Sequence, residues 1–139
     1  MKNVTIDQLR ELLDEVGLRH MKKENVLLAT LRADEDFGYD LLVLFTAEGS
    51  RLRAVAGSGG FQAPRANRLQ ALEFCNQWNA DKAAPRAYLD DEGYFRLDSC
   101  LYTDVDVDAS YIKTRFVDLF ITGAWQFFKE AGKEFSEVE

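Results

Sequence analysis

Residues 116–128 have the sequence FVDLFITGAWQFF, which predicts a strongly amphipathic helix. At the roughly 100° steps of an α-helix, most of its apolar side chains gather in one arc about 140° wide. We expect the helix to begin at Asp108 or Ser110, to reach about Ala131, and to be followed by a frayed polar tail over residues 132–139. The arc consists of Phe116, Val117, Phe120, Ile121, Ala124, Phe127 and Phe128.

The width of this arc leaves two explanations open, because an arc of about 100° is enough to pack a helix on a core. Either the chain builds a large core around the helix, or a second chain covers part of it. The second explanation extends to an earlier helix, whose apolar stripe ends at Trp78. The candidate protein-interface residues are Trp78, Trp125, Phe127 and Phe128.

The sequence before this helix predicts an α+β fold in the order α-β-β-β-α-β-β-α. Thr5 and Gln8 have the spacing of a capping box for the first helix, and Gly17 is placed to end it. The predicted sheet is antiparallel, with helices mainly on one face and the apolar second strand at its centre. We expect strands at 25–31, 39–46, 51–56, 86–90 and 94–103, and a second helix at 66–79.

Composition places the chain among globular proteins of a reducing compartment. Its 139 residues suit a single domain, 1–139, with one core. A net charge of -7 argues against a general polyanion binder, because phosphate backbones require clustered cations. Two cysteines make no disulfide framework, and no signal peptide or membrane span is indicated. We therefore expect a soluble cytoplasmic protein without a membrane partner.

No arrangement of polar residues predicts catalysis or a bound metal. His20 is the only histidine, and neither Cys75 nor Cys100 lies in a setting typical of thiol enzymes. Carboxylates at positions 104, 106 and 108 have the spacing of a calcium loop but lack its glycine and its final glutamate. The glycines at 57–60 lack the Lys-Ser/Thr of a phosphate loop. We expect no enzymatic activity, no cofactor and no metal.

One segment has a charge opposite to that of the whole chain. Residues 49–72 contain no acid and carry a charge of +4 in a chain of -7. Guanidinium groups pair with carboxylates and phosphates, so the segment could receive an acidic peptide or a nucleic acid. Alternatively its arginines pair with the chain's own carboxylates, the interpretation we favour here because most surface charges contribute little. The candidate patch is Arg51, Arg53, Arg65 and Arg68.

Two short motifs follow the apolar stripe of the second helix. NQWN occupies residues 76–79, and RAYLDDEG occupies residues 86–93. With the long strand and aromatic-rich helix that follow, they resemble the YbjN family of small bacterial proteins, often described as sensory transduction regulators. The resemblance covers nearly the whole chain and is strongest from Leu69 to Leu101. The chain departs from the family pattern at Pro85 and at residues 104–106.

The resemblance implies a fold similar to that of type III secretion chaperones. It also implies a non-catalytic protein, commonly dimeric, that acts by binding other proteins. Within the first motif we interpret Trp78 as a packing anchor, and Asn76 and Asn79 as hydrogen-bonding the connection to the hairpin.

These observations together predict a homodimeric regulator or adaptor that binds proteins, with buried aromatic residues supplying affinity and charged rims setting partner choice. Two alternatives remain open. The first is a nucleic-acid-associated accessory protein using the arginine patch, and a nucleic-acid partner is not favoured by the charge. The second is a small-molecule sensor or enzyme with its pocket between helix and sheet.

Overall fold

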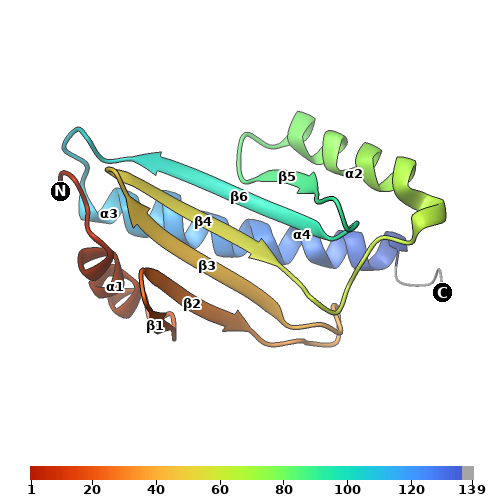
Figure 1. Cartoon of the computed structure of the whole chain (residues 1–139), viewed down its shortest axis with the longest axis horizontal. Helices are drawn as coiled ribbons and strands as arrows, with labels where there is room; N and C mark the ends of the chain where they lie inside the picture. The colour runs from red at the N-terminus through yellow and green to blue at the C-terminus, as the bar shows by residue number, and fades with distance from the viewer. Residues whose placement is uncertain (136–139) are drawn as a thin grey trace.

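The computed structural model describes residues 1–135 as an α+β fold, in which an open sheet carries the long C-terminal helix on one face and has a second helix beside its outer strand (Figure 1). Every neighbouring pair of its six strands is antiparallel, in the order β1-β2-β3-β4-β6-β5. The apolar strand expected at 39–46, the second one predicted from the sequence, corresponds to β3 of the structure. Its predicted central position in the sheet is confirmed. The strands are β1 (Met21–Lys23), β2 (Val26–Leu31), β3 (Leu41–Glu48), β4 (Arg51–Gly57), β5 (Arg86–Leu89) and β6 (Phe95–Tyr102).

Local sequence signals explain how the first helix, α1 (Ile6–Glu15), begins and ends. Thr5 accepts a hydrogen bond from the Gln8 amide and donates its own amide to the Gln8 side chain, which confirms the capping box. Gly17 follows the helix with a φ of +78°, a conformation that glycine adopts without a steric penalty. The later helical segments are η1 (Arg65–Asn67), α2 (Arg68–Asp81), α3 (Ala109–Tyr111), the π-helical η2 (Ile112–Asp118) and α4 (Leu119–Phe135).

Alternation along the strands decides which face of the sheet is buried. In β4, Leu52, Ala54 and Ala56 are fully buried, whereas Arg51 and Arg53 lie on the other face, as the sequence predicts. The long helical segment that ends in α4 lies against the buried face (Figure 1). Aromatic rings pack between the two layers, with centroid distances of 6.5 Å for Phe45–Phe120 and 5.8 Å for Phe95–Phe127.

The aromatic residues expected at a protein interface are mostly part of this core. Phe127 and Phe128 are fully buried within the chain, and Trp78 is nearly so. Trp78 of α2 packs edge-on against Phe127 at 5.2 Å, so α2 supplies cover that the sheet alone lacks. Of the four candidates only Trp125 is partly exposed. The width of the aromatic arc is therefore accounted for by the chain's own core, in which Phe127 and Phe128 are fully buried.

The C-terminal helix is longer than the sequence predicts. It continues past Ala131 to Phe135, whose buried side chain packs on Phe95 at 5.4 Å. Residues 132–135 are therefore helical, and the remainder of the predicted frayed tail, 136–139, lies outside the described residues.

Two further differences concern elements that the apolar pattern describes poorly. Strand β1 has no counterpart in the prediction, because all three of its residues are exposed and show no alternation. In α2, Leu69 and Leu72 are 66% and 42% exposed, although the sequence places them in the apolar stripe. The buried residues of that helix are Ala71, Cys75 and Trp78.

Candidate binding surface on the open face of the sheet

The sheet face opposite α4 is not covered by any helix of residues 1–135 (Figure 1). We call it the open face. Directly opposite residues of antiparallel strands point to the same side, so the strand register lists its side chains row by row. One row contains Leu28, Leu44, Val55, Asp98 and Arg86. The adjacent rows contain Thr30, Leu42, Gly57, Arg96 and Tyr88 on one side, and Val26, Thr46, Arg53 and Cys100 on the other, followed by Glu48, Arg51 and Tyr102.

These rows divide the open face into two parts. Leu28, Leu42, Leu44 and Val55, from β2, β3 and β4, form the part that we call the aliphatic half. Leu42 and Leu44 are 45% and 37% exposed, which is unusual for leucines of a strand inside a sheet. Neighbouring exposed aliphatic side chains of this kind mark contact surfaces more often than isolated ones do.

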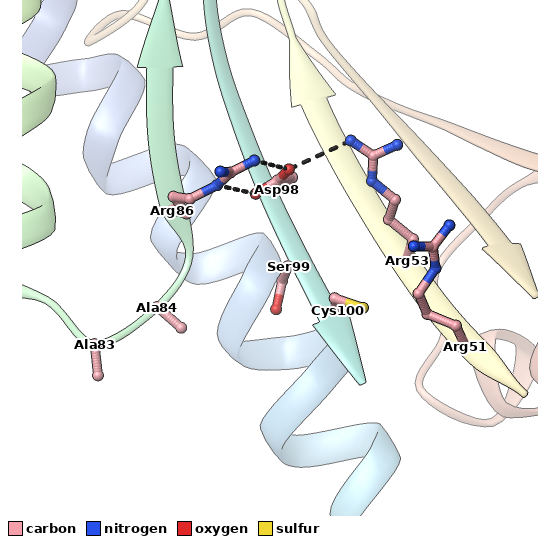
Figure 2. A pocket seen from close by; sticks show the side chains of 8 residues that line it. All are labelled: Arg51, Arg53, Ala83, Ala84, Arg86, Asp98, Ser99 and Cys100. Atoms are coloured by element: carbon pink, nitrogen blue, oxygen red, sulfur yellow. Dashed lines mark hydrogen bonds and ion pairs between the residues drawn. The ribbon is translucent and has the colours of Figure 1, made fainter. Parts of the chain in front are cut away.

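The second part of the open face lies on β4, β6 and β5. We call Arg51, Arg53 and Arg86, together with Asp98, the basic half (Figure 2). Arg86 donates to Asp98 through two atoms, from Nε to Oδ1 over 2.9 Å and from Nη2 to Oδ2 over 2.7 Å. Arg53 donates from Nη2 to the same Oδ2 over 3.3 Å. One carboxylate thus orients two guanidinium groups that reach it from different strands.

The electrostatics of Asp98 follow from this geometry. Its side chain is 12% exposed, and burial alone would raise the pKa of the carboxyl group. The hydrogen bonds and positive charges of Arg86 and Arg53 outweigh burial and hold the pKa of Asp98 below its usual value. The same pairing raises the pKa of Arg86, chiefly through its hydrogen bonds to Asp98. The Asp98 carboxylate and the Arg86 guanidinium are therefore charged at neutral pH.

The basic half borders an open depression of about 600 Å³. Arg51 lies on its border without an ion pair to any residue drawn in Figure 2. Cys100, the exposed cysteine, lies there beside Asp98 on β6, and Ala83 and Ala84 close one side of the depression.

The four arginines of the predicted patch are divided between two places. Arg51 and Arg53 belong to the basic half, whereas Arg65 and Arg68 border a different depression beside the turn between β5 and β6. The acidic side chains of Asp91 and Glu92 line that second depression as well, so its local charge is balanced.

Several residues of the open face lie outside the predicted patch. Asp98 and Arg86 belong to the hairpin, far along the chain from the acid-free segment, and only the pairing of β4 with β6 brings them beside Arg53. Leu42 and Leu44 look like core residues in the sequence because their strand is apolar at every position from 41 to 45. Their exposure depends on the absence of a second layer, which strand periodicity does not reveal.

No group of three or more potential metal ligands occurs among residues 1–135. None of the helices described there is both long enough and apolar enough to cross a bilayer.

Comparison with known protein families finds one family model that matches nearly the whole chain. The family model YbjN, described as "Putative bacterial sensory transduction regulator", matches residues 5–133. The chain belongs to the YbjN family. A comparison with curated proteins found no match.

Three proteins of known structure are similar to this chain. YbjN from E. coli, described as "a putative transcription regulator", is 18% identical to it, and its crystal structure superposes with a TM-score of 0.73 and coverage of 95% of this chain and 94% of that one. An uncharacterized protein from Methanothermobacter thermautotrophicus is 10% identical, with a TM-score of 0.55 and coverage of 95% and 99%. The Yersinia pestis type III secretion chaperone SycH, solved with a fragment of YscM2, is 17% identical, with a TM-score of 0.47 and coverage of 84% and 93%.

The residues that carried the YbjN resemblance hold β5 onto α2. Asn79 donates from Nδ2 to the Ala87 carbonyl oxygen over 2.9 Å and accepts from the Ala87 amide over 2.8 Å. Trp78 donates from Nε1 to the Pro85 carbonyl oxygen over 2.9 Å. Of the two asparagines expected to bond the connection, Asn79 makes these bonds to the hairpin. The motif thus fixes the strand that bears Arg86 in the basic half.

Proposed function

We propose that this YbjN-family protein is a non-catalytic, protein-binding regulator that acts as a cytoplasmic homodimer and contacts its partner through the open face of the sheet. The observation that supports this most strongly is the aliphatic half, where Leu42 and Leu44 are exposed in the first half of β3, a strand inside the sheet. Burying such side chains against a partner removes apolar area from water and stabilises the complex.

Self-association has a separate candidate surface in this proposal. Leu69 and Leu72 lie three residues apart on α2, so they share one helix face, and both are exposed. A two-fold axis beside α2 would bring this face against the same face of a second copy, which is how most homodimers assemble. The dimer contact and the partner contact then use different elements, and one molecule can make both.

The proposal is tested by two matched pairs of substitutions in the full chain. The variant Leu69→Glu/Leu72→Glu is expected to sediment as a monomer, whereas Leu42→Glu/Leu44→Glu is expected to remain a dimer. Affinity purification from the native host under nuclease treatment then compares the proteins retained by each variant. The Leu42→Glu/Leu44→Glu variant should lose a stoichiometric partner that the native protein retains. The circular dichroism spectrum of each variant should match that of the native protein.

Particular outcomes would contradict this proposal. A native protein that sediments as a monomer at micromolar concentration would rule out the homodimer. A partner retained equally by native protein and by Leu42→Glu/Leu44→Glu would remove the aliphatic half from the contact. Recovery of nuclease-sensitive material alone would favour the nucleic-acid alternative, for which Arg51 and Arg53 remain the candidate residues.

A further inference from the structure

We infer that the basic half of the open face receives an acidic segment of the partner protein, while the adjacent aliphatic half receives apolar side chains of that same segment. This inference rests on the proposed function and adds the chemistry of the partner. It is carried by the strand register, which brings the two halves together in one continuous surface.

The first step concerns charge. The rows of the open face bring together five cationic side chains, Lys23, Arg51, Arg53, Arg86 and Arg96, against two acidic ones, Glu48 and Asp98. Asp90, in the turn before β6, also pairs with Arg96 over 3.3 Å, which leaves five cations against three acids. This face is therefore positive on a chain whose net charge is -7. A local charge opposite to the net charge attracts anionic groups to one face and disfavours approach to the rest.

The second step concerns how the guanidinium groups are held. Asp98 accepts two N–H groups of Arg86 and one of Arg53, and each guanidinium carries five such donors. No other acceptor among residues 1–135 takes the remaining donors, so they can bind an incoming carboxylate, and the bonds to Asp98 orient both guanidinium groups. Arg51 lies on the same depression and is exposed, so it adds a third cation at the border. A ligand therefore encounters two arginines, Arg53 and Arg86, that Asp98 has oriented on folding.

The third step distinguishes a protein segment from a nucleic acid. Leu44, Val55, Asp98 and Arg86 are consecutive in one row across β3, β4, β6 and β5. At a strand spacing of about 4.8 Å, Leu44 lies about 14 Å from Arg86. A nucleic acid bound to the arginines would either place its phosphates over the exposed leucines or leave those leucines in contact with water. A peptide with carboxylates at one side and aliphatic side chains at the other matches both parts of the row.

The test measures binding of a short fluorescein-labelled peptide of alternating glutamate and leucine to the purified full-length protein by fluorescence anisotropy. The control peptide has glutamine in place of every glutamate. Arg51→Gln removes an exposed cation without an ion pair in Figure 2, and Arg68→Gln removes an exposed arginine from the other depression as its matched control. We expect Arg51→Gln to weaken binding of the glutamate peptide by about tenfold, with Arg68→Gln at native affinity.

Two further measurements sharpen this result. Arg86→Lys retains the charge but lacks the two-pronged contact with Asp98, so it should also weaken the glutamate peptide several-fold. Added salt should weaken the glutamate peptide and leave the glutamine peptide nearly unchanged. Equal affinity for the two peptides would overturn the inference, and so would equal losses in Arg51→Gln and Arg68→Gln. Binding of labelled oligothymidylate in place of the peptide, lost on Arg51→Gln, would also overturn it and assign the basic half to nucleic acid.

Failure of this inference can be told apart from failure of the proposed function. If Leu42→Glu/Leu44→Glu loses the native partner while Arg51→Gln binds the glutamate peptide normally, the open face binds a protein but not through acidic groups. If instead the peptide depends on Arg51 and the native partner persists in Leu42→Glu/Leu44→Glu, the acidic-segment contact stands and the aliphatic half is removed from it.

Discussion

Asn79 fastens β5 to α2 with one side chain that both donates to and accepts from the backbone of Ala87. Each such hydrogen bond contributes about 1 kcal/mol, and removing the amide leaves two backbone groups without this partner. We therefore expect Asn79→Ala to lower the free energy of unfolding by about 2 kcal/mol, measured by urea denaturation. Asn76→Ala, at an exposed asparagine of the same motif, is the matched control and should change stability by less than about 0.5 kcal/mol. Equal effects of the two substitutions would contradict this role for Asn79.

Asp98 makes the free energy of unfolding depend on pH in the acidic range. Its pKa is lower in the folded protein than the usual value because Arg86 and Arg53 stabilise the carboxylate. The unfolded chain therefore binds the proton more readily, and the stability contributed by this group is fully present above a pH of about 4. That contribution is lost as the pH falls through the folded pKa. In Asp98→Asn, urea denaturation from about pH 5 downward should show a smaller loss of unfolding free energy than in the native protein. An identical acid dependence would show that the ion pairs contribute nothing.

Helix α4 passes very close to the segment that leads into β5. A Cβ atom added at Gly123 would lie 2.6 Å from Cδ and 3.0 Å from Cγ of Pro85, so the backbone of one element would have to move. This close approach explains the glycine in the middle of the helix, where it costs about 1 kcal/mol relative to alanine.

Substitution of this glycine should therefore destabilise the protein although it favours the helix itself. We expect Gly123→Ala to lower the free energy of unfolding by about 1 kcal/mol or more, because overpacking typically costs about 1–3 kcal/mol. Thr122→Ala, at the exposed neighbouring position, should be neutral or slightly stabilising. Urea denaturation of both variants measures the difference, and a Gly123→Ala variant as stable as the native protein would contradict the close packing.

Elements whose signals are local could be predicted from the sequence. The capping box at Thr5, the alternation of β4 and the turn before β6 each depend on a few adjacent residues, and the structure contains all three. Strand β1 could not be predicted, because three exposed residues carry no periodic signal and their pairing with β2 is a tertiary contact. The sequence does not predict the end of α4, because burial of Phe135 depends on its contact with Phe95, a residue far along the chain.

The candidate site shows the same limit more strongly. Arg51 and Arg53 could be singled out because the acid-free segment is visible in the sequence. Their neighbours Asp98 and Arg86 could not be singled out in this way. The register of β4 with β6 and of β6 with β5 determines which residues lie opposite each other, and the sequence does not reveal it. Arg65 shares the segment but lies in another depression, since nearness along the chain does not determine nearness on the surface.

At the scale of the whole molecule, the two cysteines differ in accessibility, so their labelling rates distinguish the native protein from the unfolded one. Cys100 is exposed on the open face, whereas Cys75 is buried in α2, and burial raises the pKa of its thiol to about 11. The thiolate is the reactive form, so Cys75 is protected both by its pKa and by its surroundings.

Thiol labelling of the native protein should therefore proceed in two well separated phases. One equivalent reacts quickly with Ellman's reagent at Cys100, and the second reacts only as the molecule unfolds. In the Cys100→Ser variant the fast phase should be absent, and labelling of Cys75 should accelerate with added urea. Fast labelling of Cys75 in native buffer would show that α2 opens without unfolding of the remainder.

The hydrogen bonds of Asn79 have a consequence for the behaviour of the protein at high concentration. β5 is an outer strand, and the backbone groups of Ala87 that Asn79 occupies are ones that an incoming strand would need. The opposite outer strand, β1, is only three residues long and contains Lys22 and Lys23. Short length and lysines are features by which native sheets avoid edge-to-edge polymerisation. Both edge strands of this sheet are thereby protected against pairing with the edge strands of other molecules. A protein with one uncovered sheet face can therefore avoid polymerising at high concentration.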